Sequence, residues 1–177
     1  VAAALARSNA RRSGNPQLKM VVSALQKGDV SFLNDVEAVR YFLDAGWDVN
    51  ERTRVRNQTI LHIAAKHGDP KVVQFLVGRG AHVNIQESDG VTPLMVACME
   101  NRPKNVKALL DLSADPTIAR KDGLTPLHVA TMPSKGNVGN VLLINLLVEH
   151  GGADVNAQIP FAAKNDYIIA GNTPLHF

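Results

Sequence analysis

The sequence predicts an all-α repeat solenoid, in which helix-turn-helix pairs stack on one another and short β-hairpin fingers project from one side. Thr59, Thr92 and Thr125 follow one another at intervals of 33 residues, a period typical of stacked repeats. The hydrophobic share is 45%, but aromatic residues make up only 5%, so aliphatic side chains must fill the core. We therefore expect repetitive layers of Leu, Val, Ile and Ala between the helices.

The same local sequence recurs at each of these threonines. SDGVTPLMVA (88–97) and KDGLTPLHVA (121–130) are nearly identical, and AGNTPLHF (170–177) repeats much of them. The positions that match across the repeats are apolar or small: Leu61, Leu94 and Leu127; Ala64, Ala97 and Ala130; Val73 and Val106; Leu76 and Leu109; Ala81 and Ala114; Ile85 and Ile118. With TPLH inside this period, the chain resembles the ankyrin repeat family from about residue 16 onward. The resemblance implies an ankyrin-like stack of helix pairs that binds other proteins with its fingers and its concave inner helical face.

Each repeat should begin with a tight turn and a capped helix. The Asp-Gly pairs at 89–90 and 122–123 predict turns in which glycine takes a positive φ. The threonine that follows can cap the first helix, and the proline after it suits the first helical position. In the repeat that contains Thr59, this helix should end at Gly68, and a second helix should run from Pro70 to Gly80.

Some repeats depart from this pattern in interpretable ways. Asn57 and Asn101 stand where other repeats have glycine, and asparagine is the next most suitable residue for a left-handed backbone. Ser113 replaces a helix-terminating glycine, so we expect a strained or looser turn there. Ile60 replaces the proline after Thr59, which should weaken the helix start only slightly.

The period divides the chain into a tail and a series of repeats. We expect residues 1–15 to form a polar, basic N-terminal tail or helix extension, and residues 16–177 to form the repeat domain. Within that domain we expect a divergent capping repeat at about 16–56, repeats at 57–87 and 88–120, a repeat with insertions at 121–166, and a truncated repeat at 167–177. Since the sequence starts at Val1 rather than Met and stops at Phe177 within a motif, we expect a piece of a longer protein.

Insertions should lengthen loops without breaking the stack. In the first repeat, VSFLND (30–35) is extra, and Trp47 replaces an alanine as a packing residue of the cap. In the fourth repeat, extra residues fall near MPSKG (132–136), at Gly152, and between Asn156 and Thr173.

The histidines and the cysteine do not form a recognisable reaction centre. The sequence contains six His and one Cys, with no HExxH motif and no cysteine-rich metal spacing. His62, His128 and His176 occupy the fourth position of the TPLH-type motif, and the resemblance implies that this histidine bridges adjacent repeats. Cys98 aligns with Ala65, a small position within a helix, so we interpret it as a core residue. We therefore expect no enzyme activity, no cofactor and no metal.

Three features stand out as partner-contact candidates. The first is the alternating set Arg52, Arg54 and Arg56, which would point to one side of an extended finger. Pairing of these arginines with Glu87 and Asp89 on the next finger is an equally good interpretation. The second is the basic pair Arg120 and Lys121 on the finger after that, which gives the series basic, acidic, basic. The third is the enlarged finger at 157–171 with the aromatic residues Phe161 and Tyr167, which could instead fold back on its own repeat.

The resemblance also implies a candidate modification site. In ankyrin-like proteins, the asparagine at the end of the VN element can be hydroxylated, most readily with leucine eight residues upstream. Asn84 has Leu76 at that spacing, whereas Asn50 and Asn156 have Phe42 and Val148. Satisfying backbone groups of the finger is the alternative role for the same asparagines, and we place it first.

Together these features predict a non-catalytic scaffold or adaptor that binds a partner protein and is monomeric as this fragment. The alternative is a targeting or regulatory arm of a larger enzyme, such as a kinase or ubiquitin ligase, or of a channel. A formal charge of +3 is too small by itself to indicate nucleic-acid binding, which would also require steep salt dependence. A single Cys allows no internal disulfide, so we expect an intracellular location, cytoplasmic or nuclear. No apolar run reaches the roughly 18 residues of a membrane span.

Overall fold

The computed structural model describes residues 30–53, 56–132, 140–158 and 174 of the 177-residue chain. The chain forms two compact units, an N-terminal unit, Val1–His82, and a C-terminal unit, Val83–Phe177. Regular structure in the described ranges is entirely helical, and no strand occurs there. This result confirms the all-α repeat fold that the 33-residue period predicts.

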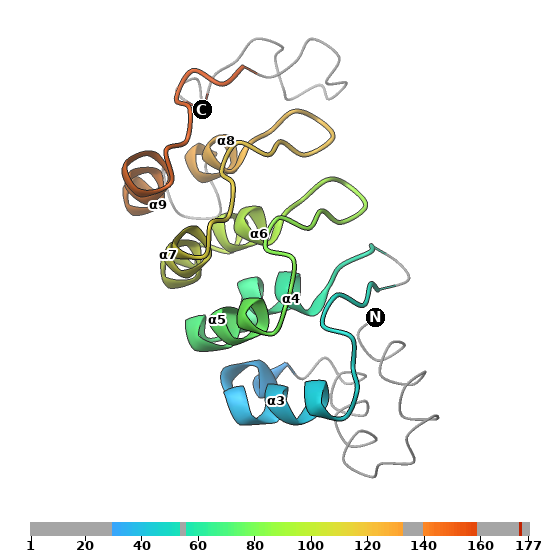
Figure 1. The fold of residues 1–177 in the computed structure, drawn as a ribbon. Coiled ribbons are helices and arrows are strands. Elements are labelled where there is room, and N and C mark those ends of the chain that lie inside the picture. The colour runs from blue at the N-terminus through green and yellow to red at the C-terminus, as the bar shows by residue number, and fades with distance from the viewer. Residues whose placement is uncertain (1–29, 54–55, 133–139, 159–173, 175–177) are drawn as a thin grey trace. The chain divides into compact units, whose positions relative to one another are not determined.

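In the N-terminal unit, two layers of helix pack on each other. A 3₁₀-helix, η1 (Ser31–Asn34), and α3 (Val36–Asp44) form one layer, and α4 (Ile60–His67) and α5 (Pro70–Gly78) form the next (Figure 1). Contacts join η1 to α4 and α3 to α5. The extra segment 30–35 is therefore part of the packing, with Leu33 completely buried.

An aromatic cluster packs within the layer formed by η1 and α3. Phe42 makes edge-to-face contacts with Phe32 and with Trp47, at ring-centroid distances of 5.5 and 5.7 Å. Trp47 is buried, and its indole N–H donates to Oε2 of Glu51 over 2.7 Å. The interpretation of Trp47 as a packing residue is confirmed.

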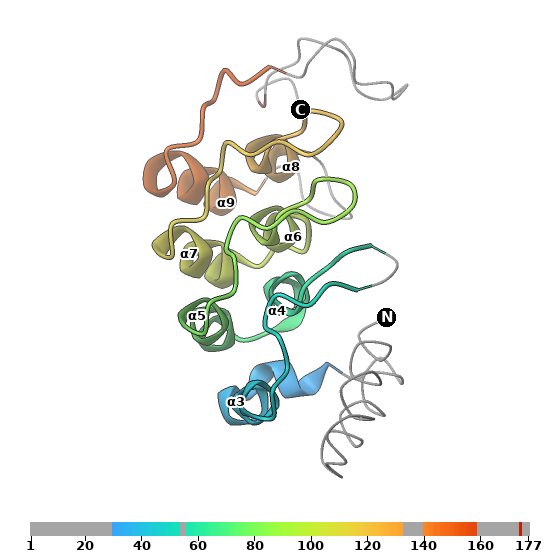
Figure 2. The ribbon, with the colours of Figure 1, turned by 45° about the vertical axis from the view of Figure 1, so that its right-hand side comes forward.

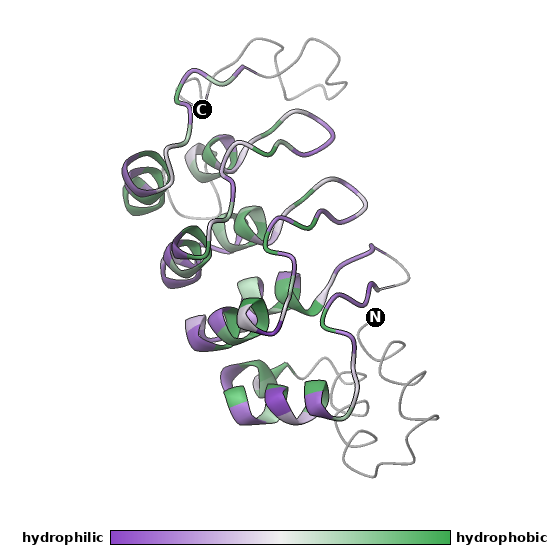
Figure 3. Ribbon diagram, viewed as in Figure 1, coloured by the Kyte–Doolittle hydropathy of each residue, from purple (hydrophilic) through white to green (hydrophobic). Residues whose placement is uncertain are grey.

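The C-terminal unit repeats the same arrangement. Helices α6 (Pro93–Met99) and α7 (Pro103–Asp111) form one pair. The next pair contains α8 (Pro126–Thr131) and α9 (Val141–Asn145), which runs on into the π-helical turn η2 (Leu146–His150). In this unit, α6 lies beside α8, and α7 lies beside α9 and η2 (Figure 2). Within each pair, the apolar residues of the helices gather on the sides that face one another (Figure 3).

The predicted left-handed turns are confirmed. Gly90 and Gly123 have φ values of +83° and +86°, and Asn57 and Asn101, which replace glycine, have +55° and +49°. Ser113 also takes a positive φ, +64°, so the turn at its position is strained, as expected.

The two completely described fingers, at 85–91 and 118–124, are turns rather than β-ladders, which differs from the predicted β-hairpins. In the finger at 85–91, Glu87 N donates to Val91 O and Gly90 N donates to Glu87 O, each over 3.0 Å. The finger at 118–124 has the equivalent bonds between Arg120 and Leu124 and between Gly123 and Arg120. Because each finger closes within a few residues, there is no length for a strand.

Two glycines with similar backbone conformations should differ in their tolerance of a side chain. A Cβ at Gly80 (φ +91°) would meet no heavy atom within 4 Å, whereas a Cβ at Gly90 would lie 2.9 Å from Lys121 N. We expect Gly80→Ala to lower the free energy of unfolding by about 1 kcal/mol through backbone strain alone. Gly90→Ala should lower it by about 2 kcal/mol or more, because a clash with the next finger is added. Equal losses in denaturant titrations would contradict this account of the finger contact.

Candidate functional site

Buried threonine–histidine pairs fix the start of the first helix in two repeats. Thr59 N donates to Nδ1 of His62, and Thr125 N donates to Nδ1 of His128, over 3.2 Å in each case. Both histidines are at most 1% exposed. Their δ nitrogens thus act as acceptors in helix capping, and bridging to adjacent repeats stays a prediction.

Asparagine side chains link successive repeats within each unit. Oδ1 of Asn50 accepts from His82 N, and its Nδ2 donates to Gly80 O, both over 2.9 Å. In the C-terminal unit, Oδ1 of Asn84 accepts from Asp115 N over 2.8 Å. For Asn50 and Asn84, these contacts confirm that the side chain satisfies backbone groups, which is the role placed first for the VN asparagines.

The two described fingers of the C-terminal unit are also tied together through the backbone. Lys121 N donates to Asp89 O over 3.0 Å. Nε2 of Gln86 donates to Ala119 O on the next finger and to Gly90 O on its own. The hydrogen bond from Lys121 to Asp89 involves only backbone atoms. The Lys121 side chain takes no part in it and is exposed.

The predicted contact residues have different degrees of exposure. Arg52 and Arg56 are exposed, and Nη1 of Arg52 donates to Asn57 O across its own finger over 3.3 Å. Glu87 is only 6% exposed, so a partner could reach its carboxylate only if the finger moved. Three other predicted contacts lie outside the described residues: Arg54, Phe161 and Tyr167. Pairing of the arginines with Glu87 and Asp89 stays a prediction.

Arg120 is held rigidly by its own finger. Its Nε donates to Oδ1 of Asp122 over 2.6 Å, and its Nη2 donates to Oδ2 of the same carboxylate. The hydrogen bond to Asp122 raises the pKa of Arg120 despite partial burial. Burial by itself would raise the pKa of Asp122, but the hydrogen bond and charge of Arg120 outweigh it, and the pKa is lowered. The pair is therefore ionised and stabilises the finger turn.

A cavity of about 210 Å³ lies in the C-terminal unit, and repeat analysis of the sequence did not reveal it. Its lining comes from α6, α8, α9 and the third finger: Cys98, Met99, Asn101, Arg120, Val129, Ala130, Met132, Asn140 and Leu143. At its border, Nδ2 of Asn140 donates to Oδ1 of Asn101. Side chains from four separate segments meet here, so only the tertiary structure reveals the cavity.

The cysteine in this cavity is unreactive by environment. Cys98 is 5% exposed, and burial raises the pKa of its thiol to about 12. The nucleophilic thiolate is therefore scarce near neutral pH. Among the described residues, no group of three or more His, Cys, Asp or Glu side chains is placed to hold a metal ion.

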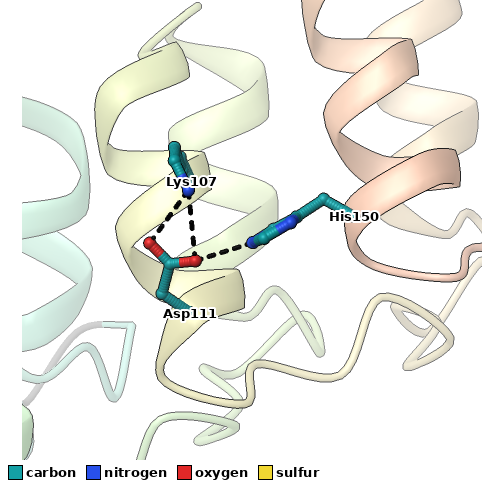
Figure 4. Close-up of polar contacts among 3 residues, drawn as sticks. All are labelled: Lys107, Asp111 and His150. Carbon is teal, nitrogen blue, oxygen red and sulfur yellow. Dashed lines mark hydrogen bonds and ion pairs between the residues drawn. The ribbon is translucent and has the colours of Figure 1, made fainter.

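An exposed polar cluster joins the outer helices of the C-terminal unit. Nζ of Lys107 lies 3.3 and 3.2 Å from the two carboxylate oxygens of Asp111, and Nε2 of His150 lies 2.6 Å from Oδ1 (Figure 4). Hydrogen bonds from His150 and then Lys107 lower the pKa of Asp111. His150 therefore links η2 to α7 through an ionised carboxylate.

Comparison with known families gives two matches along the repeats. The family of ankyrin repeats in three copies matches residues 29–120, and the single ankyrin repeat matches residues 122–159. No helix in the described ranges combines the length and apolar character needed to cross a membrane.

Similar proteins include one ubiquitin ligase and two viral proteins. The E3 ubiquitin-protein ligase hecd-1 of Caenorhabditis elegans is 36% identical over 44% of this chain. The ankyrin repeat proteins FPV222 and FPV031 of Fowlpox virus are 39% and 36% identical over 34% and 36% of this chain. The chain matches only 3%, 8% and 19% of the lengths of these three relatives.

The capping histidine should not be replaceable by the methionine that occupies the same motif position in the third repeat. His128→Met would leave the buried Thr125 N–H without the acceptor that it has now. We expect a loss of unfolding free energy of at least about 1 kcal/mol in urea titrations. Met95→Leu, at the equivalent position without a histidine, is the control and should lower the unfolding free energy by less than His128→Met does, because it conserves volume and removes no hydrogen-bond acceptor. The capping role is wrong if His128→Met has no effect.

The Asp111 cluster predicts a pH dependence with a defined sign. A carboxyl whose pKa is lowered in the folded state contributes stability above its ordinary pKa of 3.8 and loses it as the pH falls through the folded value. We therefore expect Asp111→Asn to lower the melting temperature slightly at about pH 6, where the carboxylate is ionised, and to lose this effect in strong acid. Glu149→Gln, an exposed neighbour on η2, removes the same charge and serves as the control. A difference from wild type that is constant with pH would contradict the linkage.

Proposed function

Because the chain belongs to the ankyrin repeat family, we propose that it is a non-catalytic scaffold or adaptor that binds a partner protein through its finger loops and inner helices. Protein interaction is the typical role of this family. The observation that carries the proposal is the separation of roles within the fingers. Backbone groups and the asparagines Asn50 and Asn84, which recur at the same position of the repeat, make the links between repeats, while Arg52, Arg56 and Lys121 are exposed.

This separation favours binding because the surface is already ordered. A segment that is held by its own backbone hydrogen bonds loses little conformational entropy when a partner docks. We propose that Arg52, Arg54, Arg56 and Lys121 supply the charged contacts. Arg120 adds a fixed guanidinium, and the enlarged finger at 157–171 adds Phe161 and Tyr167. Glu87 would contribute by its backbone rather than as an exposed side chain.

A second proposal concerns the protein to which this chain belongs. The match to an E3 ubiquitin-protein ligase favours a role as a targeting or regulatory arm of a larger enzyme, in which the repeats choose the partner. In this arrangement the repeats themselves remain non-catalytic. Sequencing the natural transcript on both sides of this segment would distinguish the two proposals. A catalytic domain in the flanking sequence would support the regulatory arm, and its absence would support the free-standing adaptor.

Asn84 remains a proposed hydroxylation site. Its Oδ1 is engaged by Asp115 N, so a modifying enzyme would have to act on a loosened repeat. Leu76 stands at the favourable spacing but is itself completely buried.

Charge reversal on the first finger tests the binding surface. We expect Arg52→Glu with Arg56→Glu to leave the helical content unchanged and to reduce recovery of cross-linked partner proteins from cells several-fold. Lys71→Glu with Lys104→Glu, at exposed positions at the starts of the outer helices, changes the charge by the same amount and should recover the partners normally. Equal recovery by both variants would contradict the finger surface. Loss of helicity in the first variant would show that these arginines stabilise the folded structure rather than contact a partner.

A further inference from the structure

Two methionines stand at the same position of successive repeats, at the ends of the inner helices of the C-terminal unit. Met99 is the last residue of α6, and Met132, one repeat period later, directly follows the last residue of α8. Both line the cavity of this unit. The second repeat has Lys66 at the same position, and that side chain is half-buried. A position that accepts lysine does not require an apolar side chain, so the two methionines are not needed there to fill the core.

The described methionines differ sharply in their exposure to solvent. Met99 is 49% exposed and Met132 is half-buried, whereas Met95, also on α6, is completely buried. A peroxide can oxidise a thioether only where it reaches the sulfur atom, so the rate of sulfoxide formation follows exposure. We therefore expect Met99 to react first in the folded chain, Met132 more slowly, and Met95 only when the helix opens.

The thiol next to Met99 in the sequence does not compete for the oxidant. Cys98 is buried, and burial raises the pKa of its thiol to about 12. Since the thiolate is the form of cysteine that reacts with a peroxide, Cys98 should react slowly near neutral pH. A thioether has no proton to lose, so the oxidation of Met99 does not need a lowered pKa.

Oxidation would make an apolar wall of the cavity polar. The sulfur lone pair of Met99 attacks one oxygen of hydrogen peroxide, and the O–O bond breaks. The proton of the transferred hydroxyl passes to the departing hydroxide, which leaves as water, so the sulfur loses two electrons and the peroxide is reduced. The sulfoxide oxygen is a hydrogen-bond acceptor, and Asn101, Arg120 and Asn140 bring N–H donors to the same lining. The lining can therefore accommodate the added oxygen.

We propose that Met99 and Met132 form a reversible oxidation site on the inner helices, through which a peroxide changes the partner-binding surface of this chain without unfolding it. The proposal rests on the protein-binding function proposed above and adds a means of regulating it. Lys66 at the equivalent position indicates that the repeat tolerates a polar group there. Methionine sulfoxide reductases reverse the reaction, because two thiols are oxidised to a disulfide while the sulfoxide oxygen leaves as water.

The first test treats the whole folded chain with hydrogen peroxide and follows each methionine by peptide mass spectrometry. We expect Met99 to be oxidised at least about tenfold faster than Met95, with Met132 between them, and the rates to converge in urea. Oxidation of Met99 and Met132 should leave the helical circular dichroism unchanged, and methionine sulfoxide reductases should restore the original mass. Similar native rates for Met99 and Met95 would overturn the proposal, and so would a loss of helicity that accompanies oxidation of Met99.

The second test measures binding as a ratio, the recovery of cross-linked partner proteins by the peroxide-treated chain divided by that of the untreated chain. We expect a several-fold fall for the wild type. In Met99→Leu with Met132→Leu the ratio should stay near one, because only Met20 and Met95 remain to be oxidised. Met95→Leu is the matched control, since it keeps both cavity methionines and should respond to peroxide as the wild type does.

Two results of the second test would overturn the proposal while leaving the protein-binding function in place. One is an unchanged ratio for the wild type after Met99 and Met132 are oxidised, and the other is an equal fall in the wild type and in the double variant. The protein-binding function fails separately, if the untreated wild-type chain cross-links to no partner in cells.

Discussion

A single helix pair of this chain is too thin to bury its own apolar face, so each pair must be covered by its neighbour. Within the N-terminal unit, α3 and η1 supply that cover for α5 and α4, and within the C-terminal unit α6 and α7 supply it for α8 and for α9 with η2. The packing requires successive pairs to be held at a fixed spacing. Capped helix starts, left-handed turns and asparagine side chains that reach the next repeat provide this spacing.

The same constraint explains why the outer surface can vary. The hydrogen bonds that join successive fingers run through backbone groups and through the side chains of Asn50, Asn84 and Gln86. Side chains such as Arg52 and Lys121 are exposed beside those contacts. A chain built in this way can change its charged tips without changing its core, which suits a family whose members bind different proteins.

Much of the fold could be predicted from the sequence because the repeated motif has local physical causes. The threonine caps, the proline at the first helical position and the left-handed Gly90 and Asn101 all act within a few residues. The prediction of β-hairpin fingers was wrong for the two completely described fingers. Their turn residues are typical of a hairpin, but each finger closes within five residues and is too short for a β-ladder. The burial of Glu87 could not be predicted either, since it depends on tertiary surroundings. The cavity beside Cys98 depends on four separate segments, and no spacing in the sequence brings them together.

Native-state hydrogen exchange tests the central claim, that backbone and asparagine contacts join the repeats while charged side chains of the fingers stay exposed. The amides of His82, Asp115 and Lys121 donate to the next or preceding repeat and should be protected to nearly the free energy of global unfolding. The amide of Arg56, on an exposed turn, should exchange much faster. If the three linking amides exchanged as fast as the amide of Arg56, the repeats would not be joined through these contacts.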